Sequence, residues 1–151
     1  MPDCSHADPE SASPTAAAWQ ATLRLRFADD HGVTRLVERT HSGPLRVQKP
    51  LYPEGDRICH AIVVHPPGGV VGGDTLQIDV EAGAGAHALL TTPGAGKWYR
   101  ANGKVSRQRV SLRGEYRQRY LFEVSWQPVW GGDYNALADR DVVAISAGVK
   151  F

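Results

Sequence analysis

The ten-residue stretch from His65 to Asp74 constrains the fold of this chain more than any other part. It reads His65-Pro-Pro-Gly-Gly-Val-Val-Gly-Gly-Asp74, with four glycines and two prolines. Such a composition cannot form a helix, and it indicates a backbone that needs positive φ values or a close approach to another surface. A second glycine-containing loop, from Thr92 to Arg100, carries Lys97 and Arg100. Because binding residues concentrate on loops held by a rigid scaffold, candidate sites are sought here first.

The segments around these loops have the two-residue period of β-strands. In residues 19–27, apolar side chains alternate with polar or charged ones, which is typical of a half-buried strand with a charged outer face. A turn at 29–32 and a returning segment at 33–41 predict a hairpin. Further strands are predicted at 45–48, 58–64 (buried on both faces), 76–81, 86–92 and, after a hairpin turn at Asn102-Gly103, 105–113. No segment up to residue 113 has a helical apolar period, so the sequence predicts an all-β fold.

Length, charge and cysteine usage narrow the class of protein. At 151 residues the chain is long enough for one domain with its own core. A formal net charge of +1 argues against a dedicated nucleic-acid surface. Cys59 lies in an apolar segment, which predicts a packed thiol in a reducing compartment. The sequence has neither an apolar run of membrane-spanning length nor the start of a signal peptide, so we expect a cytoplasmic protein.

Patterns typical of nucleotide, metal and hydrolase sites do not fit this chain. Gly96-Lys97 lacks the first glycine and the hydroxyl residue of a P-loop, and Gly83-Ala-Gly85 precedes a strand rather than a helix that binds pyrophosphate. The histidines and Cys59 lack the spacing of a metal site, which leaves His65 as a weak candidate for a transient metal contact. No serine lies in a nucleophile elbow. We therefore expect a protein without catalytic activity and without a stably bound cofactor.

Taken together, several segments resemble the urease accessory proteins of the UreD (also called UreH) family. They are a Leu-Arg-Phe strand, the stretch His65–Asp74, the segment Gly85-Ala-His-Ala-Leu-Leu-Thr-Thr-Pro-Gly94 and Lys97-Trp-Tyr-Arg100. The resemblance covers about residues 19–113. It implies an extended, layered β-sheet domain of β-helix or sandwich type with few or no helices. It also implies a non-enzymatic chaperone or scaffold that helps nickel enter apo-urease.

The same resemblance implies partners and site residues. The expected partners are apo-urease, a helical accessory protein of the UreF type and an accessory GTPase of the UreG type, with nickel handled only transiently and no nucleic acid bound. The residues carried over are Gly72, Gly73 and Asp74 in the first loop, and Lys97, Tyr99 and Arg100 in the second. These loops could pass a divalent ion between oxygen ligands, or they could set the register of a protein interface. A third interpretation is structural: Asp74 caps its turn, and Lys97 is a solvated charge.

Three parts are expected along the chain. Residues 1–18 are polar and contain several prolines, which predicts a disordered lead-in. Residues 19–113 form the UreD-like domain, which is expected to be truncated because family members are longer, and residues 114–151 form a divergent β-hairpin tail. In that tail, strands at 120–127 and 142–151 flank a loop at Gly131-Gly132-Asp133. They resemble the closing hairpin of an outer-membrane β-barrel, or else form an ordinary hairpin that completes the sheet. The alternative to a urease role is thus a non-functional fragment or a fusion product.

Overall fold

The computed structural model describes residues 18–66, 68–94, 97–99, 103–116, 120–127, 129–130 and 142–149. These residues form ten β-strands and no helix, which confirms the predicted all-β fold. Within the same residues, no helix is therefore long and apolar enough to cross a membrane. Almost all of the expected lead-in at 1–18, and the tail loop at 131–133, lie outside the described residues.

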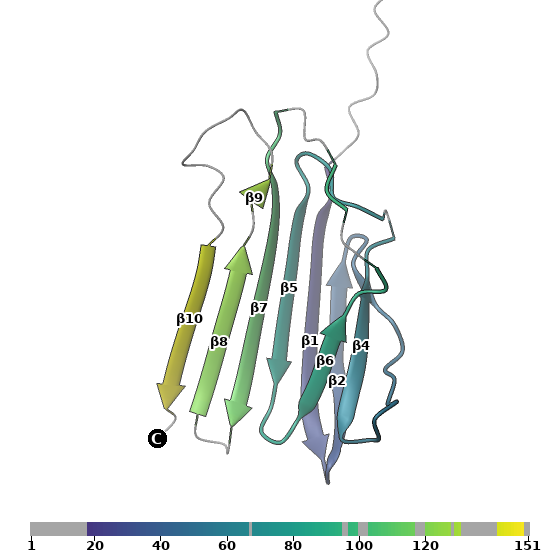
Figure 1. Ribbon diagram of the computed structural model, residues 1–151, viewed down its shortest axis with the longest axis vertical. Helices are drawn as coiled ribbons and strands as arrows, with labels where there is room; N and C mark the ends of the chain where they lie inside the picture. Colours follow the sequence, from purple (N-terminus) through teal and green to yellow (C-terminus); the bar gives the residue numbers. More distant parts are fainter. Residues whose placement is uncertain are drawn as a thin grey trace, which may run out of the picture.

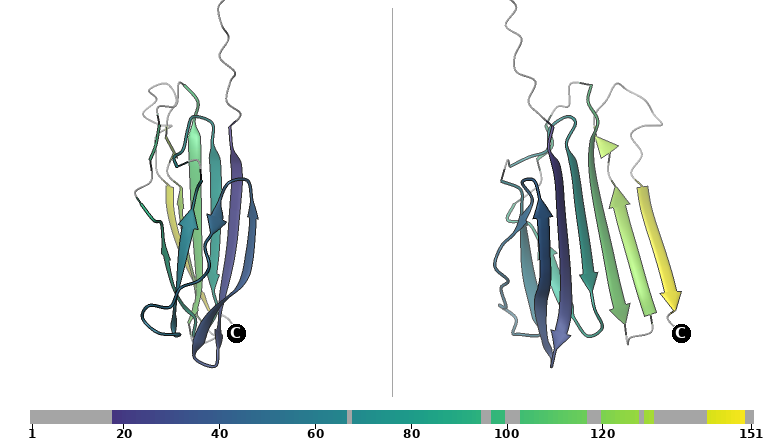
Figure 2. Two further views of the ribbon diagram at one scale, coloured as in Figure 1. Left: turned by 90° about the vertical axis from the view of Figure 1, so that its right-hand side faces the viewer. Right: turned by 180° about the vertical axis from the view of Figure 1, so that it is seen from behind.

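The strands form two sheets that lie face to face as two layers (Figures 1 and 2). Their bounds are β1 Gln20–Asp30, β2 Val33–Ser42, β3 Arg46–Val47, β4 Ile58–Val64, β5 Thr75–Ala82, β6 His87–Thr91, β7 Ser106–Tyr116, β8 Tyr120–Gln127, β9 Val129–Trp130 and β10 Val142–Val149. The larger, seven-stranded sheet has the order β10-β8-β7-β5-β1-β2, and β9 pairs with β7. The smaller sheet has the order β3-β4-β6.

Strand pairing agrees with the sequence prediction in part. β1 and β2 form the predicted antiparallel hairpin, and β8 pairs antiparallel with β10 in the tail. The hairpin predicted at Asn102-Gly103 is wrong. Gly103 does turn the chain, with φ of 78°, but β7 pairs in parallel with β5 and antiparallel with β8 and β9. The domain boundary predicted at residue 113 falls inside β7, which continues to Tyr116.

The core lies between the two sheets. On β1, four alternate residues are at most 2% exposed, and the β5 neighbours of the first three in the register are buried as well. These buried residues are Ala21, Leu23, Leu25 and Phe27 on β1, and Leu76, Ile78 and Val80 on β5, which cluster with Cys59, Ala61 and Val63 of β4. The prediction that 58–64 is buried on both faces is wrong, because the alternate residues of β4 are only partly buried. The outer face of the smaller sheet has no third layer over it in the described part of the chain.

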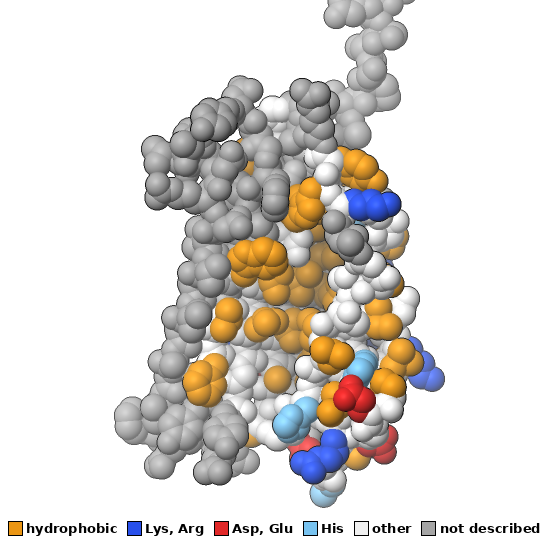
Figure 3. All heavy atoms as spheres, viewed as in Figure 1, with side chains coloured by type: hydrophobic (Ala, Val, Ile, Leu, Met, Phe, Trp, Pro, Cys, Tyr) orange, Lys and Arg blue, Asp and Glu red, His pale blue; other side chains and the backbone are white. Residues whose placement is uncertain are grey.

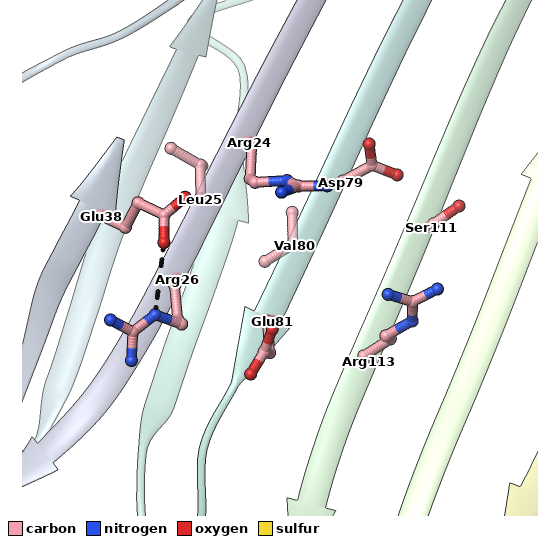
Figure 4. Close-up of a pocket in the computed structure, with 9 residues that line it drawn as sticks. All are labelled: Arg24, Leu25, Arg26, Glu38, Asp79, Val80, Glu81, Ser111 and Arg113. Carbon is pink, nitrogen blue, oxygen red and sulfur yellow. Dashed lines mark hydrogen bonds and ion pairs between the residues drawn. The ribbon is translucent and has the colours of Figure 1, made fainter. Parts of the chain in front are cut away.

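The outer face of the larger sheet carries a row of alternating charges across five strands. The Nε atom of Arg26 on β1 lies 3.4 Å from Oε2 of Glu38 on β2. The Nε atom of Arg113 on β7 lies 3.2 Å from Oε2 of Glu123 on β8. Glu81 of β5 stands in register between the two arginines. Figure 4 shows four side chains of this row, from Glu38, Arg26, Glu81 and Arg113, around a shallow hollow that Arg24, Asp79 and Ser111 also line. Opposite charges in one row favour this strand order over other pairings.

Reversing the central charge of this row tests its contribution. We expect Glu81→Lys to lower the free energy of unfolding by about 1 kcal/mol, because it places three cations in adjacent positions. Glu81→Gln removes the charge without adding a repulsion and is the matched control, with an expected change within about 0.5 kcal/mol. Urea unfolding at low and high salt measures both. Equal losses for the two variants would show that the charge row does not stabilise the sheet.

Candidate functional site

The two loops selected from the sequence lie side by side in the structure. Val70 in the first loop and Trp98 in the second form a parallel β-bridge. The Val70 amide donates to the Lys97 carbonyl at 2.9 Å, and the Tyr99 amide donates to the Val70 carbonyl at 2.9 Å. Backbone bonds of this kind fix the relative position of two segments that are far apart in the sequence. Arg100, the remaining predicted residue of the second loop, lies outside the described residues.

Gly69 is the glycine that this contact requires. A Cβ atom at Gly69 would lie 2.3 Å from Cε2 of Tyr99 and 3.1 Å from the Lys97 carbonyl oxygen. The Tyr99 ring therefore lies on backbone that has no side chain, and any larger residue would displace it. Sequence reasoning did not select Gly69 as a site residue. Its position among three other glycines and two valines gives no local signal of which residue contacts the second loop.

Asp74 is fully buried, and its carboxylate is occupied by backbone donors. Oδ1 accepts a hydrogen bond from the Trp19 amide at 2.8 Å, and Oδ2 accepts one from the Val71 amide at 2.9 Å. The Asp74 carbonyl accepts from the Arg107 amide at 2.8 Å. One residue thus joins the first loop to the start of β1 and the start of β7. These bonds support the structural interpretation of Asp74, in which the carboxylate caps the turn.

The glycines before Asp74 shape the same turn. Gly73 has φ of 95°, a conformation that favours glycine, and a Cβ there would lie 3.0 Å from Cβ of Ala18. Gly72 is partly buried in the turn beside it. The Ser106 hydroxyl donates to the Val71 carbonyl at 2.6 Å, which binds the turn to β7. Gly73 therefore has a backbone role, and neither glycine adds a side-chain group to the site.

Three side chains next to the bridge between Val70 and Trp98 face solvent. Lys97 is exposed, Tyr99 is 54% exposed and Val71 is 36% exposed. We call Val71, Lys97 and Tyr99 the loop-pair surface. It combines an aromatic ring, an aliphatic side chain and a cation on a backbone held by hydrogen bonds. Such a surface is suited to contact with another protein, because tyrosine is among the residues that most often dominate interface energies, and a charge beside it favours one orientation of the partner.

His65 lies at the start of the first loop, within electrostatic reach of Asp74. Burial lowers the pKa of His65 below its ordinary value of 6.5, and the negative charge of Asp74 opposes this shift. Its Nε2 atom is buried and has no hydrogen-bond partner among the described residues. The described residues contain no group of three or more potential metal ligands. His65 as a transient metal contact therefore stays a prediction.

Comparison with known proteins finds one family. A family model described as "UreD urease accessory protein" matches residues 20–117, which include both loops. A urease accessory protein UreD of Janthinobacterium sp. is 69% identical over 93 residues, or 62% of this chain and 31% of the relative. Proteins of the same name from Cupriavidus necator and Cupriavidus pinatubonensis are 60% and 54% identical over 71% and 82% of this chain, respectively, and 37% and 41% of their own lengths. The chain therefore spans only between 31% and 41% of the length of these relatives.

The contact between Gly69 and Tyr99 predicts a specific coupling. We expect Gly69→Ala to lower the free energy of unfolding by about 1–3 kcal/mol, because its methyl group overlaps the Tyr99 ring. Tyr99→Ala in the same chain is expected to restore much of this loss. Gly94→Ala is the control, since a Cβ there meets nothing within 4 Å. A double-mutant cycle measured by urea unfolding gives the coupling, and purely additive losses would contradict the contact.

The lowered pKa of His65 predicts a stability change with pH. Because burial disfavours the imidazolium, the unfolded chain binds a proton at higher pH than the native chain does. The free energy of unfolding should therefore fall as pH drops from about 7.5 to about 5. His65→Gln removes the titrating imidazole, so the free energy of unfolding of this variant should depend less on pH over the same window. Parallel curves for the two proteins in urea unfolding would show that His65 is not buried in the neutral form.

Proposed function

The chain belongs to the UreD urease accessory protein family, and from this membership we propose that it acts as a non-enzymatic scaffold in the incorporation of nickel into apo-urease. The observation that carries the proposal is the family match over residues 20–117, which includes both paired loops. The proposed partners are apo-urease, a helical accessory protein of the UreF type and an accessory GTPase of the UreG type. Nickel is the cargo of this assembly, and the chain handles it only transiently. The cytoplasmic location stays a prediction.

We propose the loop-pair surface as a docking site for another protein of the urease assembly. Val71, Lys97 and Tyr99 are exposed, whereas the backbone beneath them is held by the bridge between Val70 and Trp98. A surface that is ordered before binding loses less entropy when a partner binds. The buried carboxylate of Asp74 supports this division of roles. It holds the loop in place, and the exposed residues of the pair meet the partner.

A separate observation favours a second role, a transient contact between nickel and His65. The Nε2 atom of His65 has no hydrogen-bond partner among the described residues, and the lowered pKa keeps the imidazole neutral near pH 7. A neutral imidazole nitrogen is a good ligand for divalent nickel. A single imidazole binds a divalent ion weakly, which suits passage of the ion better than storage. The same loop would then contact the cargo on one side and a partner protein on the other.

Docking through the loop-pair surface is tested by urease activation in cells. The chain is co-expressed with urease and its other accessory proteins in a host that lacks its own family member. We expect Lys97→Ala with Tyr99→Ala to lower the nickel content of purified urease by about fivefold or more, as for loss of an interface anchor. Lys49→Ala, which removes an exposed lysine elsewhere, is the control and should leave nickel content unchanged.

The same assay separates docking from passage. His65→Gln should lower nickel content while leaving the amount of chain that co-purifies with apo-urease unchanged. The Lys97 and Tyr99 substitutions should lower both quantities together. Wild-type values for all of these variants would contradict both roles of the loops. If the wild-type chain itself fails to activate urease, the proposed scaffold function of this chain is wrong.

A further inference from the structure

The apolar face of the larger sheet extends beyond the smaller sheet that covers it. β4 packs near β2, and β6 packs near β1, so the described part of the smaller sheet covers one side of that face. On the other side, four large apolar side chains are between 37% and 49% exposed: Leu112 of β7, and Phe122, Val124 and Trp126 of β8. We call them the open strip. Figure 3 shows hydrophobic side chains gathered on this face, beside the smaller sheet.

The open strip is continuous and uncharged. Val124 pairs with Leu112, and Trp126 pairs with Val110, so the four side chains occupy neighbouring positions on one face. On β10, the register places Val143, Ile145 and Ala147 opposite Trp126, Val124 and Phe122. An apolar patch of this kind on a soluble protein marks a contact site. Its partner must also be apolar, because no charged residue stands in these register positions.

The two strand edges beside the open strip also lack the features that block further pairing. β10 is the last strand of the larger sheet, and β6 is the last strand of the smaller one. Their sequences, VVAISAGV and HALLT, contain no lysine, arginine, acidic residue or proline. The opposite edges differ, because β2 carries Arg35, Glu38 and Arg39, and β3 carries Arg46. Charged side chains and prolines protect edge strands from association, so β6 and β10 are the edges suited to pairing.

We propose that the open strip is the contact surface of a two-fold symmetric dimer of this chain. A two-fold axis parallel to the strands places the strip of one copy face to face with the strip of its partner. The β10 edge of each copy then lies in the same layer as the β6 edge of the other. β6 runs opposite to β10 in Figure 1, and this rotation keeps strand direction, so the two edges meet antiparallel. One symmetry operation thus covers both apolar strips and pairs all four unprotected edges.

The size of the strip sets the expected affinity. Together with the β10 positions beside it in the register, the open strip spans three strands of about eight residues, an area about 14 Å wide and about 26 Å long. This is roughly half of the area that one partner contributes to a standard interface. We therefore expect a reversible dimer with a dissociation constant in the micromolar range. The contact uses residues outside the loop-pair surface, so it stands or fails independently of the proposed urease role.

Sedimentation velocity of the purified full chain tests the dimer. From about 1 μM to about 100 μM, a range that brackets the affinity of a small interface, the wild-type chain should shift from monomer to dimer. Val124→Lys places a charge in the strip and should weaken dimerisation by about tenfold or more. Val37→Lys makes the same change at an exposed position of β2 and should dimerise as the wild type does. Leu112→Lys on β7 is a second strip variant, and circular dichroism checks that each variant is folded.

Amide hydrogen exchange supplies a measurement that needs no substitution. In the wild-type chain, protection of β6 and β10 should rise with protein concentration, whereas protection of β2 should not change. A chain that stays monomeric over this range, or a Val124→Lys variant that dimerises like the wild type, would overturn the proposal. If the pure chain is monomeric but binds a longer family member through contacts sensitive to Val124→Lys, the strip takes a different polypeptide and the two-fold contact is wrong.

Discussion

Burial of one face of β1 is the contact on which the rest of this structure depends. β1 pairs with β2 on one side and with β5 on the other, so it fixes the centre of the larger sheet. Leu25 and Phe27 are completely buried against the smaller sheet. Each such side chain contributes about 1.5–3 kcal/mol when it leaves water. Without this face, the smaller sheet would have no layer to pack on, and the loops that follow its strands would lose their support.

The loop pair depends on the same strand through Asp74. The carboxylate of Asp74 accepts hydrogen bonds from the backbone at the start of β1 and from its own turn, and its carbonyl accepts one from β7. The core therefore determines where the first loop begins, and the bridge at Val70 determines where the second loop lies. A substitution at Asp74 acts on the position of Lys97 and Tyr99 as much as on the charge of the loop. Through this coupling, a change at the buried carboxylate would alter the proposed docking surface.

The two faces of the larger sheet differ in the side chains that they present. Its outer face carries alternating charges that are satisfied within the chain, as between Arg113 and Glu123. Its inner face carries the core residues of β1 and β5 and the open strip of β7 and β8, but the described part of the smaller sheet covers only one side. The uncharged edges of β6 and β10 lie beside the uncovered side, and the charged edge of β2 lies away from it. The charged surfaces, which are the outer face and the β2 edge, thus find their ion pairs within one chain or stay in solvent. The uncharged surfaces, which are the open strip and the edges of β6 and β10, are suited to contact with a partner.

Local sequence determined the strands and the family of this protein, and tertiary structure decided how its parts meet. The two-residue period of residues 19–27 was sufficient to predict β1, because side-chain alternation is a local property of an extended backbone. The glycine loops were sufficient to indicate the UreD family. Sequence could not predict that β7 pairs in parallel with β5, because non-local pairing depends on which apolar faces can be buried together. Nor could it distinguish a solvated Asp74 from the buried one, or identify Gly69 as the contact for Tyr99. Those outcomes depend on backbone donors and rings from distant segments, which only the folded chain brings within bonding distance.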